Sequence, residues 1–477
     1  MAEEWYAHTP PEHDRQRWHK LEDHLQAVAD MAAEFGAAFG AEHICRALGA
    51  SHDLGKRDPR FQAYLHMCAK GERGTSVPHA AAGAAASMSV LGPFALAILG
   101  HHTGIPDKAD AQSRLASADP VTVQAARAGA AILSRPEAPS WADSPRSAEL
   151  LVRMCFSALT DADYLDTERH MNPALATQRQ GAQPLSWYED ALRRHLMELR
   201  ASAPPSEVNA IRNEVLDACY RAAEDPPQAY RLTVPTGGGK TLASLTFALR
   251  HAVRHDLRRV IVAIPYTSII DQTATVYAKV FGSEHVLAHH SGYDPGDDTE
   301  EQSLAELRRK LATENWDVPL VVTTTVQLFD SLFSNRPKPC RKLHRIARSV
   351  IILDEAQTLP PELLDPILDV LGELIRHYGC SVVFCTATQP DYSALAGTLL
   401  ANAQEIVPSP ERYFDSLRRV RYTRAPAPLT IAEVASRLDA ENQALCILNT
   451  RKDAVRIALA CRRDDALFHL STLMCPD

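Results

Sequence analysis

Histidine and aspartate residues recur through the first third of the chain in positions that favour a metal site. His52 and Asp53 are adjacent at the end of a predicted helix, where their side chains would lie about 100° apart and grip one cation together. The other candidates lie on predicted helices or at their ends: His24, His79, His101, His102 and Asp163, with Asp161 as the rival to Asp163. Imidazole and carboxylate ligands suit divalent manganese, iron, cobalt, nickel or zinc. Two such ions can activate a water molecule and neutralise a scissile phosphate, so the pattern indicates phosphoester hydrolysis.

A second stretch has the residue types of a phosphate-binding loop. An apolar run ending at Val234 predicts a buried parallel strand, and helical spacing follows from Thr241 to Ala252. The loop between them provides glycines, an ammonium and hydroxyls: Thr236, Gly237, Gly238, Gly239, Lys240 and Thr241. Backbone N–H groups and the helix N-terminus would cradle phosphates. Lys240 would reach the β- and γ-phosphates, and the Thr241 hydroxyl would hold Mg²⁺.

Two carboxylates complete the predicted nucleotide site. The apolar run 349–353 predicts a buried strand that delivers Asp354 and Glu355. Asp354 at the carboxyl end of that strand suits Mg²⁺, and Glu355 suits polarising the attacking water. We therefore expect Mg·ATP as the ligand of this region.

The elements that must position these groups differ between the two halves of the chain. The first half shows amphipathic helices, such as the one over Trp18–Phe39, and predicts an all-α domain. After the loop, strands and helices alternate as a doubly wound parallel sheet requires. A polar, proline-containing stretch at 201–206 is the best linker. We predict an all-α domain over 1–200, a RecA-like lobe over 206–415, and the start of a second lobe over 416–477.

The predicted second lobe begins with a strand over 442–450 and a helix over 451–461, followed by a further strand and loop over 466–475. In the first lobe, the segment 336–348 carries seven basic or histidine side chains. Such a run predicts either a solvated face or a track for the phosphates of a nucleic acid.

Composition sets outer limits on function. The 477 residues are 45% hydrophobic and 23% charged, which is typical of a globular protein with several cores. A net charge of −9 argues against general affinity for nucleic acids, so any such track must be local. The ten cysteines form no Cys-x-x-Cys pair and indicate reduced thiols in the cytoplasm. We expect neither a signal peptide nor a membrane span.

The motifs together resemble a known family. The order His, His-Asp, His, His-His, Asp is similar to the HD phosphohydrolase superfamily, whose usual Ala-Asp-aromatic pattern favours Asp163 over Asp161. Pro235 to Thr241 fits the loop variant of superfamily-two helicases, although the strict pattern has glycine where this chain has Val234. Thr386-Ala387-Thr388 and the junctions 260–272 and 320–329 resemble motifs that contact nucleotide and single-stranded DNA in those helicases. The whole chain looks like a CRISPR-associated helicase–nuclease of type I systems.

The resemblance implies specific roles. His24, His52, Asp53 and Asp163 would hold one metal ion, and Asp53, His79, His101 and His102 a second, with Asp53 bridging them. Lys56 would meet the phosphate. The intact family cuts the single DNA strand that a Cascade guide-RNA complex displaces, and it unwinds DNA in the 3′-to-5′ direction. We expect a cytoplasmic monomer. The later motifs of the family, including an arginine finger, are absent from this sequence, so we expect little ATP turnover from it. The alternatives are a remnant that binds DNA or Cascade without turnover, and an HD nucleotide phosphohydrolase with a regulatory loop lobe.

Overall fold

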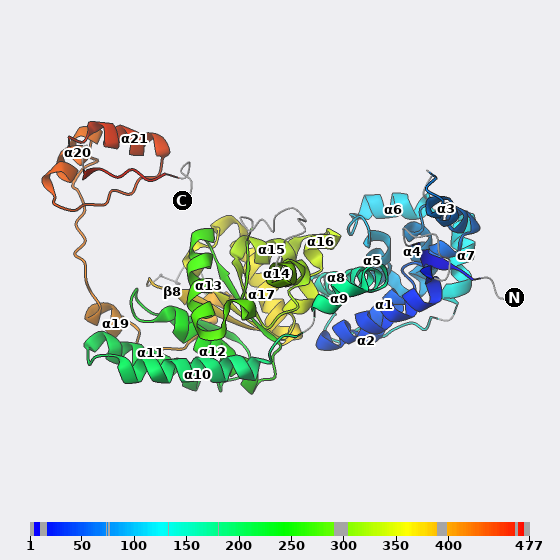
Figure 1. The fold of residues 1–477 in the computed structure, drawn as a ribbon, viewed down its shortest axis with the longest axis horizontal. Coiled ribbons are helices and arrows are strands. Elements are labelled where there is room, and N and C mark those ends of the chain that lie inside the picture. The colour runs from blue at the N-terminus through cyan, green and yellow to red at the C-terminus, as the bar shows by residue number, and fades with distance from the viewer. Residues whose placement is uncertain are drawn as a thin grey trace. The chain divides into compact units, whose positions relative to one another are not determined.

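The computed structural model describes residues 4–9, 17–72, 74, 77–131, 133–179, 181–290, 304–388, 398–462 and 466–471. The chain folds into two compact units, with the boundary between Leu417 and Arg418. The first unit holds a helical region followed by a parallel-sheet lobe, as predicted, and the second is small (Figure 1).

The N-terminal region is helical apart from a two-stranded ribbon, β1 (Tyr6–His8) with β2 (His19–Lys20). Its long helix α8 packs against α1, α2 and α5. The predicted inward face of α1, from Leu21 through Val28 to Phe35, is buried, and His24 on that face is 0% exposed. The helices are α1 (Leu21–Gly36), α2 (Glu42–Gly49), α3 (Pro59–Ala69), α4 (Ala80–Leu91), α5 (Ala95–Gly100), α6 (Lys108–Ala116), α7 (Pro120–Ala130), α8 (Pro145–Met171) and α9 (Pro173–Ala176).

The stretch Ala80–Gly100 is long and apolar enough to be compared with a membrane span. The stretch has 21 residues and contains an 18-residue window with a mean hydropathy of 1.8, so by length and composition alone it passes as a membrane span, which was not predicted from the sequence. Here it forms α4 and α5, separated by a 3₁₀ turn at Gly92–Phe94. The two helices pack on each other and on α2, and side chains such as Leu91 and Ile98 join the core. These contacts identify it as a core segment of the helical region.

The first lobe is built on a seven-stranded sheet in the order β5-β6-β4-β7-β8-β3-β9, with every paired strand parallel. The strands are β3 (Ala229–Thr233), β4 (Arg259–Ile264), β5 (Leu287–His289), β6 (Leu320–Thr324), β7 (Ser349–Leu353), β8 (Ser381–Thr386) and β9 (Gln404–Glu405). The helices are α11 (Glu207–Ala222), α12 (Lys240–Arg254), α13 (Thr267–Phe281), α14 (Leu304–Asn315), α15 (Thr325–Phe333), α16 (Pro337–Cys340), α17 (Leu364–Tyr378), α18 (Leu399–Asn402) and α19 (Glu411–Ser416). The four central strands β4, β6, β7 and β8 are fully buried, as parallel strands covered on both faces must be.

Helix α10 (Leu185–Ser202) precedes the predicted linker, and the boundary predicted at residue 200 would place it in the helical domain. Its buried side chains Leu185, Tyr188 and Leu192 belong to the core of the lobe, and the helix packs against α12 and α13. Hydrophobic burial therefore attaches α10 to the sheet lobe.

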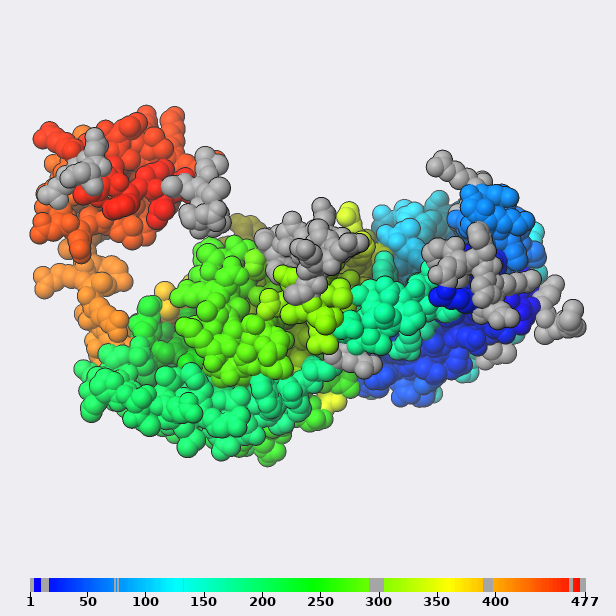
Figure 2. Space-filling model, in the orientation of Figure 1, coloured from blue at the N-terminus to red at the C-terminus, as the bar shows by residue number. Residues whose placement is uncertain are grey.

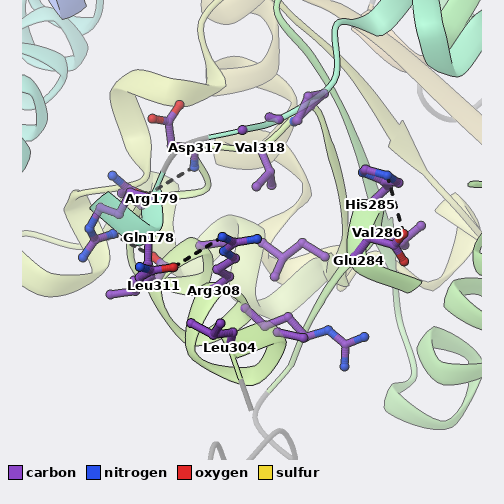
Figure 3. Close-up of a pocket in the computed structure, with 18 of the residues that line it drawn as sticks. Gln178, Arg179, Glu284, His285, Val286, Leu304, Arg308, Leu311, Asp317 and Val318 are labelled. Atoms are coloured by element: carbon purple, nitrogen blue, oxygen red, sulfur yellow. Dashed lines mark hydrogen bonds and ion pairs between the residues drawn. The ribbon is translucent and has the colours of Figure 1, made fainter. Parts of the chain in front are cut away.

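The basic run 336–348 is neither a solvated face nor an open track for most of its length. Arg341, Lys342 and His344 are 5%, 6% and 3% exposed, because they lie between the lobe and α8 of the helical region. The sequence of a basic segment does not show which acidic side chains pack against it in the folded protein. Figure 2 shows the cyan-to-teal end of the helical region lying directly against lime-green residues of the lobe. A cavity of about 370 Å³ opens beside this contact, with Arg179, Glu284 and Leu311 in its wall (Figure 3).

The second unit contains α20 (Ile431–Ala440) and α21 (Arg451–Ala460), each begun by a capping threonine, Thr430 or Thr450. The helix predicted over 451–461 is confirmed. The strand predicted over 442–450 is not formed, and residues 466–471 are not a strand either, while 472–475 lie outside the described residues. Leu445 and Ile447 are 84% and 83% exposed, so the apolar run within 442–450 is present without a strand among the described residues to pair with.

Candidate metal centre and nucleotide-binding loop

The predicted metal ligands come from five separate segments that meet in the helical region. His24 lies on α1, His79 is the residue before α4, His101 and His102 follow α5, and Asp163 lies on α8. His52 and Asp53 were predicted at the end of a helix, but α2 ends at Gly49 and they occupy the turn that follows. The side chains of Ser51 and His52 hydrogen-bond to the carbonyls of Ala47 and Gly49, at 2.6 and 2.8 Å, and so occupy carbonyls that a continuing helix would use. The turn therefore presents Asp53 inward from a non-helical backbone.

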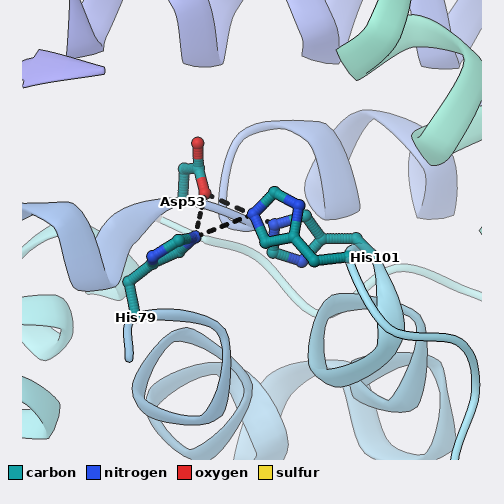
Figure 4. Close-up of side chains that lie close together, drawn as sticks. Asp53, His79 and His101 are labelled. Carbon is teal, nitrogen blue, oxygen red and sulfur yellow. Dashed lines mark hydrogen bonds and ion pairs between the residues drawn. The ribbon is translucent and has the colours of Figure 1, made fainter. Parts of the chain in front are cut away.

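Asp53 lies between two groups of histidines. Its Oδ1 atom is 3.1 Å from Nε2 of His79 and 3.5 Å from Nε2 of His101, as Figure 4 shows. Its Oδ2 atom is 3.5 Å from Nε2 of both His24 and His52. One carboxylate thus offers one oxygen to each group, which is the arrangement a bridging ligand needs.

The ligand atoms form two compact groups. Asp53, His79, His101 and His102 offer atoms within 4.8 Å of one another, and so do His24, His52 and Asp163. Nε2 of His24 is 3.4 Å from the Asp163 carboxylate, and Nε2 of His52 is 3.7 Å from it. His79 and His102 bring their Nε2 atoms to 3.0 Å of each other. The structure therefore brings together every residue predicted for the two metal sites.

The histidine rings are oriented as metal ligands usually are. Nδ1 of His24, His52 and His101 is anchored at 2.7, 2.8 and 2.6 Å to Asp166, the Gly49 carbonyl and the Ile98 carbonyl, respectively. The Nε2 atoms of the same three rings, and Oδ1 of Asp53, are buried with no hydrogen-bond partner among the described residues. Anchoring one ring nitrogen fixes the tautomer and leaves the other free to ligate. Buried polar atoms are rarely left unpaired, so these residues fit divalent cations.

The electrostatics of the centre also suit cations. Burial lowers the pKa values of His79 and His101, and burial together with the nearby His101 lowers that of His102 to about 4, so these rings are neutral. Although burial opposes its charge, the Lys56 ammonium and the surrounding histidines hold the pKa of Asp53 well below its usual range. Burial likewise opposes the charge of Asp163, but the nearby His24 and His52 rings hold its pKa well below its usual range. His24 differs, because its acidic neighbours Asp163, Asp166 and Asp53 raise its pKa well above the usual value although burial opposes this, so a cation would have to displace a proton from that ring. Neutral imidazoles and ionised carboxylates are the forms that bind metals.

Asp161 and Asp163 face different surroundings. Asp163 faces the histidines, whereas Asp161 is hydrogen-bonded by Asn315 and Arg341 of the sheet lobe. This geometry agrees with Asp163 as the ligand. Sequence reasoning missed Asp166, which accepts the His24 hydrogen bond and lies three residues after Asp163. That i, i+3 spacing on a helix is the signal that could have found it.

Lys56 and His8 also lie beside the centre. Lys56 is 3% exposed, and its ammonium contacts Asp53 Oδ2 at 2.6 Å and donates to the Ala7 carbonyl at 3.2 Å. The Lys56 ammonium therefore pairs with the shared Asp53 carboxylate and does not point to solvent, from where a substrate phosphate would approach, so this arrangement does not favour the predicted phosphate contact. His8, which is not among the predicted ligands, lies against the centre with its ring centroid 5.0 Å from that of His24.

The nucleotide loop connects β3 to α12. Gly237 and Gly239 have φ values of 92° and 85°, which favour glycine. A Cβ atom on Gly238 would lie 2.6 Å from Cγ1 of Val234. Because Gly238 has no side chain, it leaves room for Val234, the residue that stands where the strict pattern has glycine. A cavity of about 500 Å³ lies over the loop and includes Thr236, Lys240 and Thr241 in its wall.

The acidic pair follows β7 and meets the loop lysine. Nζ of Lys240 lies 2.9 Å from Asp354 Oδ1 and also contacts Glu355 Oε1. Burial opposes the lysine charge, but these carboxylates raise the pKa of Lys240, and Lys240 helps to lower the pKa of Glu355 against its own partial burial. Thr388 donates its N–H to the Thr386 hydroxyl at 3.1 Å at the end of β8, and Ala387 lines the same cavity. Groups from three strand ends thus converge where a Mg·nucleotide would bind.

Comparison with known proteins assigns one family description to each half. Residues 6–182 match the Cas3 HD domain, and residues 211–395 match the DEAD/DEAH box helicase domain. The CRISPR-associated nuclease/helicase Cas3 of Haloferax volcanii is 31% identical over an alignment of 231 residues, and the match covers 42% of this chain and 24% of that protein.

Solved structures of T. fusca Cas3 share the fold. The structure with AMPPNP has a TM-score of 0.53 at 17% identity, over 87% of this chain and 53% of that one. Another T. fusca Cas3 structure has a TM-score of 0.54 at 16% identity, over 89% and 54%. The chain thus spans about half the length of these structures and about a quarter of the curated relative. The helical region with its HD centre thus matches the Cas3 HD domain, and the sheet lobe with its nucleotide loop matches the DEAD/DEAH box helicase domain, so the chain carries both domains in the order expected from the sequence.

Proposed function

We propose that this chain is a metal-dependent nuclease that hydrolyses single-stranded DNA at the HD centre. The observation that supports this most strongly is the Asp53 carboxylate, which directs one oxygen to each of two histidine groups, and the Nε2 atoms of His24, His52 and His101 in these groups are buried without a hydrogen-bond partner among the described residues. Two divalent cations bound there would activate a water molecule and neutralise the scissile phosphate.

The protein contributes preorganisation to this chemistry. His24, His52 and Asp163 would hold one ion, His79, His101 and His102 the other, and Asp53 both. Backbone carbonyls and Asp166 fix the rings, so little reorganisation is needed when cations enter. His102 is the most exposed of these ligand candidates, which places the opening for a substrate on its side of the centre.

For the sheet lobe we propose Mg·ATP binding by the loop, with Thr241 and Asp354 toward Mg²⁺, Lys240 toward the phosphates and Glu355 toward the attacking water. In the longer family proteins we propose that this lobe drives 3′-to-5′ DNA unwinding. The pairing of Lys240 with both carboxylates supports the assignment. When a nucleotide binds, its phosphates would take the place of a carboxylate as the negative partner of the lysine.

The biological substrate that we propose is the DNA strand displaced when a Cascade-type guide-RNA complex opens its target. The match of residues 6–182 to the Cas3 HD domain and the similarity to a CRISPR-associated nuclease/helicase support this proposal. We further propose that the protein acts as a monomer in the cytoplasm.

The test uses the full chain stripped of metal and then supplied with Mn²⁺. We expect cleavage of an end-labelled single-stranded oligonucleotide without ATP, and we expect Asp163→Ala to abolish it. Asp161→Ala should retain more activity, because Asp161 faces the lobe and not the histidines. A control is His43→Ala, an exposed histidine outside the centre.

Cleavage that survives Asp163→Ala at the parent rate would contradict the assignment of the centre. Hydrolysis of free deoxynucleoside triphosphates in preference to the oligonucleotide would show instead an HD nucleotide phosphohydrolase.

A further inference from the structure

Helix α8 has one face toward the metal centre and another face that contacts the sheet lobe. Asp163 and Asp166 face the histidines, whereas Asp161 and Ser157 face the sheet lobe. Two residues along a helix turn the side chain by about 200°, so Asp161 and Asp163 must point in nearly opposite directions. The helix that carries a metal ligand is therefore also the wall against which the lobe packs.

Asp161 is completely buried and every partner it has among the described residues belongs to the lobe. Its carboxylate accepts hydrogen bonds from Asn315 at 3.0 and 3.2 Å and from Nε of Arg341 at 2.9 Å. Arg345 and His344 approach the other oxygen at 3.6 and 3.7 Å. A fully buried carboxylate with several donors is a strongly directional contact.

The lobe presents a buried cationic cluster to this carboxylate. Burial and the neighbouring Arg341 lower the pKa of Lys342 to about 8, and burial and Arg345 lower that of Arg259 to about 9. Such values show side chains crowded by like charge with little water to screen it. Asp161 brings a carboxylate of the helical region to Arg341, Arg345 and His344 in this cluster.

Further contacts bind the same helix to the same segment. Arg341 stacks over Tyr164, the residue next to Asp163, at 4.7 Å, and the backbone N–H of His344 donates to the Ser157 hydroxyl at 2.9 Å. Arg341 also contacts Glu314 at 3.1 Å, and Arg179 joins Glu314 to Glu168 on α8. The contacts extend along α8 from Ser157 to Glu168 and include both sides of the ligand.

We propose that Asp161 is a positioning residue through which the helicase lobe holds α8, and thereby Asp163, in the geometry that binds metal at the nuclease centre. The bound segment, residues 337–346, lies between α15 and β7, and β7 ends at Leu353, next to Asp354 of the nucleotide site. The inference rests on the metal-binding role proposed above for the centre.

The experiment measures Mn²⁺ affinity of the metal-stripped full chain by electron paramagnetic resonance of free Mn²⁺. Asp161→Asn keeps the size and an acceptor oxygen but removes the charge, and Arg341 keeps its contact with Glu314, so the variant should fold. Loss of groups that orient metal ligands typically weakens metal binding about 10- to 100-fold, and we expect about tenfold here because Asp161 acts through the helix.

The matched control is Asp369→Asn. Asp369 pairs with Arg146, at the start of the same helix, at 2.5 Å across the same contact, but that arginine is 72% exposed and lies far along α8 from the ligands. We expect its Mn²⁺ affinity to equal that of the parent. Arg341→Gln should reproduce the loss, and the double variant Asp161→Asn with Arg341→Gln should be no weaker than either single change, since both remove one interaction.

The outcomes separate this inference from the proposed function. A parent chain that binds no Mn²⁺ overturns the proposed centre and this inference with it. A parent that binds Mn²⁺ while Asp161→Asn and Arg341→Gln bind it equally well overturns this inference alone, even if both variants melt at lower temperature, because the role would then be only structural. If Asp161→Asn does not fold, Arg341→Gln by itself decides the question.

Discussion

Replacing the shared ligand Asp53 should disturb the metal-free protein as well as its chemistry. In the structure the Asp53 carboxylate is the counter-charge of Lys56, whose ammonium is 3% exposed and has the Ala7 carbonyl as its other contact. Asp53→Asn removes the charge but not the lysine. A buried ion pair broken on one side typically costs about 3–5 kcal/mol, because the remaining charge stays desolvated.

That cost predicts a measurable local effect. Hydrogen–deuterium exchange of peptides covering α2 and α3 in the metal-free chain should speed up about 10²- to 10⁴-fold, since each 1.4 kcal/mol is about a factor of ten. Adding Lys56→Met removes the stranded ammonium, so the double variant Asp53→Asn with Lys56→Met should recover most of the protection. Neither variant should bind Mn²⁺ at both sites or cut DNA, because both lack the carboxylate common to the two groups.

The double variant separates the effect of the Lys56 ammonium from the effect of the other Asp53 contacts. If Asp53→Asn exchanges like the parent, the Lys56 ammonium is not held in a desolvated position and the buried pair is wrong. If the double variant exchanges as fast as the single one, the lost protection comes from Asp53 contacts other than Lys56. In either case an Asp53→Asn chain that cuts at the parent rate would remove Asp53 from the metal centre altogether.

Three further predictions concern single residues. Asp166→Asn should weaken Mn²⁺ binding about 10- to 100-fold by freeing the His24 ring, as measured by titration of the metal-stripped chain, and unchanged affinity would refute its orienting role. Lys240→Ala should abolish binding of a fluorescent ATP analogue while leaving Mn²⁺-dependent DNA cutting unchanged, since the loop and the metal centre lie in different regions; loss of cutting would contradict that separation. A hydrogen bond from Arg60 lowers the pKa of Asp58, which caps α3, from 3.8 to about 2. Asp58 thus stabilises the fold above its unfolded pKa and loses this contribution as the pH falls from about 4 to 2, so acid unfolding should show a smaller pH dependence in Asp58→Asn, and an identical dependence would refute the assignment.

The sequence by itself determined the chemistry of both sites. Ligand types such as the His52-Asp53 pair and the loop ending at Lys240 are readable because metal and phosphate binding restrict side chains and local spacing. The same holds for the class of the elements: helical periodicity placed His24 on the inward face of α1, and apolar runs predicted the buried strands β4, β6 and β7.

Only the tertiary structure decided which groups meet. Asp161 and Asp163 are equally acidic in the sequence, and α8 separates them because successive helical residues point to different neighbours. Lys56 carries the charge that a phosphate contact needs, yet folding buries it on Asp53. The apolar run within residues 442–450 predicted a strand that does not form, since strand pairing requires a neighbour that the sequence pattern does not specify.

The basic segment shows the same limit most clearly. Arg341 and Arg345 are as consistent with a solvated face or a DNA track as with a buried contact, because charge alone does not name its partner. Their counter-charge, Asp161, lies 180 residues away from Arg341 in the sequence and reaches it only when the helical region packs on the lobe. Long-range electrostatic complementarity is a property of the folded arrangement. In this protein it joins α8 of the helical region and the sheet lobe in one buried network around Asp161.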